Sequence, residues 1–205
     1  MVEWLLRLLY SEQQMTSASV SELCSALEAG ATEGPTGLCI TPHLPGTCTP
    51  DFDPHATGLI HGIRPNTTRN DLYKGILEGI ACEFAAMADL LQGVVGRFDD
   101  VYVTGGGGRS RLGLKLRASL ASRRLLLMQS PEAVCLGTAI LAGVAAGTYR
   151  SFEEAVNQVV VPIDTIQPDP DVTTSYSRQV QQYRLLYSSL VPMRQAAFQS
   201  GGGKT

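Results

Sequence analysis

Charge is scarce in this 205-residue sequence: charged residues make up 17% of it, and lysine and arginine form no basic stripe. The formal net charge is −3, so a nucleic-acid partner is not expected, because nucleic acids select clustered positive charge. Long hydrophobic runs are missing too. The apolar start, Met1–Tyr10, is interrupted by Arg7 and has neither a cationic lead nor a small-residue cleavage site. It predicts an amphipathic packing helix, and neither a signal peptide nor a membrane span.

Closely spaced metal ligands are also missing from the sequence. The five cysteines are scattered and form no C-x-x-C pair, and His43, His55 and His61 show no H-x-x-x-H spacing. Zinc sites usually show such spacings. We therefore expect no metal site, and we expect reduced thiols in a cytoplasmic protein without a membrane partner.

The sequence does contain a run of four glycines, Gly105–Gly108, between a short apolar strand and a helix. Glycine lets the main chain approach a ligand, and a helix start offers unpaired N–H groups. The dinucleotide fingerprint G-x-G-x-x-G fails, because its third glycine falls on Ser110 or Arg111. A phosphate loop at residues 201–205 fails because its first glycine falls on Phe198. Two interpretations of the glycine run remain: a turn that binds a nucleoside, and a βα turn without a ligand. The run of four glycines favours the turn that binds a nucleoside.

The hydrophobic periodicity predicts one α/β domain over residues 1–198 and a flexible tail over 199–205. Residues 42–66 form a predicted loop, and a loop of this length suggests a function. Residues 162–170 are predicted to be a connector. Helices are expected at residues 2–10, 19–29, 110–122, 132–146 and 173–198. Two more are expected behind capping sequences: one starts at residues 67–71 and runs to about 91, and a short one follows the capping box 151–154. Strands are expected at residues 38–41, 101–104 and 125–128.

The helix that ends near residue 91 has a wide apolar face, so we expect it to pack against a sheet. Gly75 and Gly79 lie on one stripe of this helix and permit close backbone approach. Glu78 is charged within a mostly apolar segment, for which a buried structural hydrogen bond is the favoured interpretation over catalysis.

Several segments resemble the C-terminal domain of the FGGY carbohydrate kinase family, in particular its xylulose and fuculose kinases. Thr104–Ser110 is similar to the family's adenosine motif, a strand followed by G-G-x-x-x-[SN]. Pro131–Ala139 is similar to its E-a-x-x-x-G-A-A helix. The remaining matches, in the family's order, are Pro42–Gly62, Leu72–Gly79 and Pro168–Tyr187.

The resemblance implies an actin-like, ribonuclease-H-like ATPase fold, with a mixed sheet flanked by helices, of which this chain is the second lobe without its opening strands. It implies ATP or ADP, magnesium bound with the nucleotide, and transfer of the γ-phosphoryl group to a sugar or polyol hydroxyl. In the family the first lobe carries the sugar site, a phosphate loop and the aspartate base. Because D-x-G-T-[ST] and G-D runs are missing here, the resemblance assigns no catalytic residue and no metal ligand to this chain. It predicts little activity for this chain alone.

The resemblance also places adenosine at the glycine run. Gly105 and Gly106 are expected to contact adenine through the backbone, with Ser110 as a polar contact at the helix start. Gly107 is expected to shape the turn. Thr104 either hydrogen-bonds the ligand or simply ends the strand.

A second adenosine-side element is implied at Glu132 and Gly137, although Glu132 alternatively only favours its helix N-terminus electrostatically. The chain departs from the family in the helix after the glycines. Gly113 replaces an aromatic residue, Lys115 replaces a glutamine, and Ser119 replaces an aspartate.

Three functions therefore remain open. The chain is the nucleotide-binding lobe of a sugar kinase, a non-catalytic nucleotide-binding or regulatory module, or an inert fragment. Where the family often has E-R-T-P, this chain has Thr47–Pro50, and the departures at Lys115, Ser119 and Thr47–Cys48 favour the second. A lone lobe should expose apolar surface, so we also expect self-association as a homo-oligomer.

Overall fold

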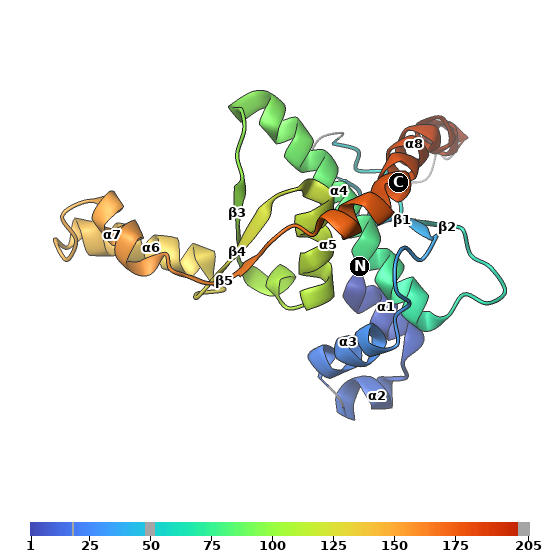
Figure 1. Ribbon diagram of the computed structural model, residues 1–205, viewed down its shortest axis with the longest axis horizontal. Coiled ribbons are helices and arrows are strands. Elements are labelled where there is room, and N and C mark those ends of the chain that lie inside the picture. Colours follow the sequence, from blue (N-terminus) through green and yellow to red (C-terminus); the bar gives the residue numbers. More distant parts are fainter. Residues whose placement is uncertain (18, 48–51, 201–205) are drawn as a thin grey trace.

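The computed structural model describes residues 1–17, 19–47 and 52–200. Figure 1 shows a long central helix, α4, with three short N-terminal helices at one end, and α6 and α7 at the far side of a small sheet. The elements are α1 (Val2–Leu9), α2 (Glu12–Ser17), α3 (Val20–Ala29), β1 (Cys39–Thr41), β2 (Leu59–His61), α4 (Arg69–Val95), β3 (Asp100–Val103), the 3-10 turn η1 (Gly105–Gly108), α5 (Arg111–Ala121), β4 (Arg124–Met128), α6 (Ala133–Ala145), α7 (Phe152–Val159), β5 (Pro162–Ile166) and α8 (Pro170–Ser200).

The larger sheet has three strands in the order β3-β4-β5, with β3 and β4 parallel and β4 and β5 antiparallel. A separate antiparallel pair joins β1 and β2. Helix α5 packs on β4 and β5, and α4 packs on α5 and β1. The predicted α/β class with a mixed sheet and flanking helices is confirmed.

Two strands and one helix were missed by the sequence prediction. Strand β2 lies inside the predicted loop 42–66, and β5 lies inside the predicted connector 162–170. Each depends on pairing with a partner strand that is distant in sequence, and β5 begins with Pro162 at a sheet edge, where a missing N–H is tolerated. Helix α2 was also not predicted. Helix α8 continues to Ser200, and residues 201–205 of the predicted tail lie outside the described part.

The main core lies between α1, α3, β1 and α4, and it includes the two helices, α1 and α4, whose apolar faces predicted packing. Helix α4 lies so close to β1 that a Cβ atom at Gly79 would be 2.1 Å from the Ile40 carbonyl oxygen. The predicted close approach is therefore confirmed. The buried apolar residues of this core are Leu5, Leu6, Leu23, Leu27, Leu38, Ile40, Tyr73, Ile76, Leu77, Ala81, Leu116 and Tyr176.

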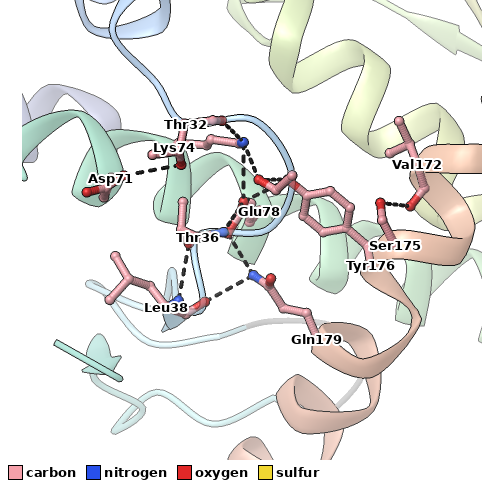
Figure 2. A network of polar contacts seen from close by, with 11 residues as sticks. Thr32, Thr36, Leu38, Asp71, Lys74, Glu78, Val172, Ser175, Tyr176 and Gln179 are labelled. Atoms are coloured by element: carbon pink, nitrogen blue, oxygen red, sulfur yellow. Dashed lines mark hydrogen bonds and ion pairs between the residues drawn. The ribbon is translucent and has the colours of Figure 1, made fainter. Parts of the chain in front are cut away.

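A buried polar network joins α4, α8 and the segment before β1 (Figure 2). Glu78 is 0% exposed, and its carboxylate accepts hydrogen bonds from Thr36 (N–H 3.1 Å, Oγ1 2.5 Å), from the Tyr176 hydroxyl at 2.8 Å and from Gln179 Nε2 at 2.8 Å. Lys74 Nζ is 4.0 Å from Glu78 Oε1. The predicted structural role of Glu78 is thus confirmed: it ties three segments together.

The start of α4 is held by a capping box, as its sequence predicted. Thr68 Oγ1 accepts from the Asp71 N–H at 3.2 Å, and Asp71 Oδ2 accepts from the Thr68 N–H at 2.9 Å. We expect Thr68→Ala to lower the free energy of unfolding by about 1 kcal/mol, the usual contribution of a helix cap. Urea unfolding followed by circular dichroism measures this. Thr68→Ser keeps the hydroxyl and should stay near wild type; equal midpoints for the two variants would contradict the role of the cap.

Candidate functional site

A cavity of about 430 Å³ lies between the glycine run, α1, α3, α4 and α5. The glycine run and α5 form one side of it, and α1 and α3 supply residues from the N-terminal part of the chain. Its lining residues are Val2, Glu3, Val20, Ser21, Cys24, Ser25, Glu28, Tyr73, Leu77, Ile80, Gly106, Gly107, Arg109, Ser110, Arg111, Gly113 and Arg117.

The glycine run presents bare backbone to this cavity. After β3 the chain turns through η1, where Gly105 has a φ of +71° and donates its N–H to the Pro131 carbonyl at 2.9 Å. A positive φ favours glycine at this point. A Cβ atom at Gly106 would meet no other atom within 4 Å. The predicted strand, glycine turn and helix are therefore present, with one 3-10 turn between the strand and α5.

Ser110 caps α5 and is also tied to α3. Its oxygen accepts from the Gly113 N–H at 2.9 Å, and its hydroxyl donates to Glu28 Oε1 at 2.7 Å. The Tyr73 hydroxyl donates to the same Glu28 oxygen at 2.9 Å. Residues from α3, α4 and the start of α5 thus share one carboxylate at the cavity.

Arg117 and Cys24 are two further polar side chains of the cavity, and both are half-buried. Arg117 donates from Nε to the Gly113 carbonyl at 3.1 Å and from Nη2 to the Gly107 carbonyl. Burial lowers the pKa of this guanidinium, which still stays charged because arginine starts so high. Burial raises the pKa of the Cys24 thiol, so it stays protonated at neutral pH and is a weak nucleophile.

Three of the seven residues predicted to bind the nucleotide line the cavity: Gly106, Gly107 and Ser110. Thr104 and Gly105 lead the chain into it. Glu132 and Gly137 lie outside the lining: Glu132 is an exposed residue before α6 without a side-chain cap, and Gly137 lies within α6. In Figure 1, α6 and α7 extend away from α1 and α3.

The residues that α1 and α3 contribute to the cavity were not predicted from the sequence. Glu28, Cys24 and Glu3 come from these helices. The helices themselves were predicted, but about eighty residues separate Glu28 from the glycine run. No local pattern indicates that contact.

Of the three departures in α5, Gly113 lines the cavity, whereas Lys115 and Ser119 have structural partners away from it. Lys115 Nζ pairs with Asp169 Oδ2 at 2.9 Å. The buried Ser119 oxygen accepts from the Asp169 N–H at 3.0 Å. Both residues thus tie α5 to the start of α8, and neither lines the cavity. Cys48, the second residue of the Thr47–Cys48 departure, lies outside the described residues.

Within the part of the chain that the structure describes, no three or more His, Cys, Asp or Glu side chains group so that they could hold a metal ion. Among the same residues, no helix combines the length and apolar character needed to cross a membrane.

Comparison with known proteins gives concordant results. The model of the FGGY family of carbohydrate kinases, C-terminal domain, matches residues 1–146. Xylulose kinase of Staphylococcus epidermidis is 26% identical over 161 residues, which cover 78% of this chain and 32% of that protein. L-xylulose/3-keto-L-gulonate kinase of Escherichia coli is 32% identical over 137 residues, covering 65% of this chain and 27% of the relative.

The similar solved structures are also carbohydrate kinases. Xylulose kinase from Rhodospirillum rubrum superposes with a TM-score of 0.78 at 25% identity, covering 95% of this chain and 38% of that chain. The chain spans about a third of the length of the curated relatives it matches. Its fold is that of the actin-like ATPase lobe found in these kinases. The chain belongs to the FGGY family of carbohydrate kinases, whose C-terminal domain it contains.

Proposed function

We propose that this chain is the nucleotide-binding lobe of an ATP-dependent sugar or polyol kinase, and that the cavity at the glycine run holds adenosine. The cavity is the observation that supports the proposal: Gly106, Gly107 and Ser110, chosen from the sequence, line it together with residues of α1, α3, α4 and α5. Its volume of about 430 Å³ lies within the usual range for small-ligand sites.

The phosphates, the magnesium ion and the acceptor sugar lie beyond this cavity in the proposal. Magnesium is bound with the nucleotide, and no residue of this chain is assigned to it. Phosphoryl transfer depends on positioning and charge neutralisation around the phosphates. We therefore propose that the acceptor and its base are supplied by a second lobe, and that this chain alone transfers nothing.

We further propose a cytoplasmic protein that self-associates when the lobe is alone. Apolar side chains stand exposed on α6, where Val134 is 84% and Leu141 60% exposed, and on the second half of α4, at Leu90, Leu91 and Val94. Exposed apolar patches of this kind favour association.

A titration with ADP tests the proposed cavity. Gly106→Val should weaken ADP binding at least about tenfold, equivalent to about 1.4 kcal/mol, because the side chain would enter the cavity. The variant should still fold, since no atom lies within 4 Å of the added Cβ. Calorimetry measures the affinity, and fluorescence of Trp4, 40% exposed on α1, gives a second signal.

Gly93→Val is the matched control, because Gly93 lies on α4 away from the cavity and also has no neighbour within 4 Å of a Cβ. It should bind ADP like wild type. If wild type binds no ADP at millimolar concentration, the nucleotide proposal is wrong. If wild type and Gly93→Val bind it and also fail to phosphorylate any of a panel of sugars and polyols, the non-catalytic alternative and the incomplete enzyme both remain. Adding a separately expressed first lobe then distinguishes the two by restored transfer.

A further inference from the structure

Helix α6 is apolar on all sides and largely exposed. None of its residues, Ala133–Ala145, is charged, and only Ile140 is fully buried. Its one hydroxyl group, Thr138 Oγ1, donates to the Val134 carbonyl at 2.9 Å, so it is satisfied within the helix. A helix without a polar face is usually buried. Within one copy of the chain, α6 therefore leaves an apolar surface uncovered.

A second uncovered apolar surface is a groove of about 400 Å³ between the second half of α4 and β3. Strand β3 is the last strand on its side of the larger sheet, so the groove lies at the open edge of that sheet. Its lining side chains are all apolar. They include Phe84, Met87, Leu91 and Val94 of α4, with Phe98 and Val101 from the segment that follows. We call this hollow the α4 groove.

The α4 groove and α6 match in length and in chemistry. At 1.5 Å per residue, the wall from Phe84 to Val94 is about 15 Å long, and the 13 residues of α6 span about 20 Å. Val134 and Leu141 are 84% and 60% exposed, and they lie two turns apart on one side of α6. Helices that dock into apolar grooves use anchor residues at this spacing. Docking would bury no charge, because neither surface contains one.

A single copy of the chain does not bring the two surfaces together. Figure 1 shows α6 well apart from the second half of α4, with the sheet between them. Short connections hold α6 and α7 in that place, from Met128 of β4 to Ala133 and from Val159 of α7 to Pro162 of β5. A contact between α6 and the α4 groove therefore needs a second copy.

We propose that α6 of one copy docks into the α4 groove of a second copy, so that two copies exchange their α6 helices in a dimer. The exchange covers both surfaces of both copies, and the two-fold symmetry is that of most homodimers. This inference deepens the proposed self-association by naming the surfaces that meet, and it does not depend on nucleotide binding.

Analytical ultracentrifugation of the 205-residue chain across the micromolar range tests the exchange. Wild type should be dimeric. Leu141→Lys on α6 and Leu91→Lys in the α4 groove should each raise the dimer dissociation constant at least about tenfold, because a charge would enter an apolar contact. These side chains are 60% and 50% exposed within one copy, so both variants should fold, as circular dichroism can verify. Leu8→Lys, the same change at a 65% exposed position of α1, is the matched control and should stay dimeric.

Mixing the two variants identifies which surfaces meet. Leu141→Lys keeps an intact groove and Leu91→Lys keeps an intact α6, so a mixture can rebuild one of the two contacts. The mixture should form heterodimers at concentrations where each variant alone is monomeric. If α6 instead paired with α6, and groove with groove, every contact in the mixture would contain a lysine and the mixture would stay monomeric.

The other outcomes separate this inference from the proposals on which it builds. A monomeric wild type would overturn both the exchange and the proposed self-association. A dimer that both variants leave intact would overturn the exchange alone. If only Leu91→Lys weakens the dimer, the groove receives another part of the second copy, such as the open edge of β3, and the assignment of α6 is wrong; if only Leu141→Lys does so, α6 docks outside the groove. The ADP titration tests nucleotide binding separately from all of these results.

Discussion

Gly79→Ala is expected to lower the free energy of unfolding by about 3 kcal/mol, the upper end of the usual effect of overpacking. The added Cβ atom would lie 2.1 Å from the Ile40 carbonyl oxygen. That oxygen belongs to β1 in the main core, and backbone cannot turn aside as a flexible side chain can. Helix propensity alone would favour alanine here by about 1 kcal/mol, so the sign of the measured change decides which effect dominates.

Gly93→Ala provides the matched control in the same helix. No atom lies within 4 Å of a Cβ at Gly93, so alanine should stabilise α4 by up to about 1 kcal/mol. Urea unfolding of both variants, followed by far-ultraviolet circular dichroism, gives the two values. An unchanged or raised midpoint for Gly79→Ala would show that α4 and β1 lie farther apart than the structure places them.

Local chemistry made much of the fold predictable. The capping boxes at Ser19 and Thr68 mark helix starts through contacts within four residues. Contacts this local can be predicted from the residue types alone. Strand β2 has only three residues and exists because Leu59–His61 pairs with Cys39–Thr41. Such pairing is decided by tertiary structure, which is why both β2 and β5 were missed.

The residues of the candidate site also fall into those that local sequence predicts and those that only tertiary structure brings together. Gly106, Gly107 and Ser110 could be chosen from the sequence because glycines at a strand–helix turn have a local physical purpose. Glu28 gave no such signal, since a charged residue near a helix end is ordinary. Its importance comes from its contact with Ser110, which only the folded chain creates.

Glu78→Ala is expected to lower the free energy of unfolding by about 3–5 kcal/mol, as for a buried charge pair that loses one member. The substitution removes the acceptor of the Tyr176 and Gln179 hydrogen bonds. It also removes the nearest carboxylate from the buried Lys74 ammonium, which keeps the backbone carbonyls of Thr32 and Gly34 and the weaker attraction of Asp71 and Glu33. Each unsatisfied buried donor costs about 1–3 kcal/mol. The hydrogen bonds lost in α4, α8 and the segment before β1 therefore add to the loss of the Lys74–Glu78 ion pair.

Tyr176→Phe separates the network from the cavity left by truncation, because it removes one donor and keeps the ring. It should lower the free energy of unfolding by about 1 kcal/mol on its own. In the Glu78→Ala background the same change should have almost no further effect, because its main acceptor is gone; the double-mutant cycle measures this coupling. Additive losses would mean that Glu78 stabilises the fold by filling space. Strong coupling would mean that the hydrogen bonds of Glu78 hold α8 to α4.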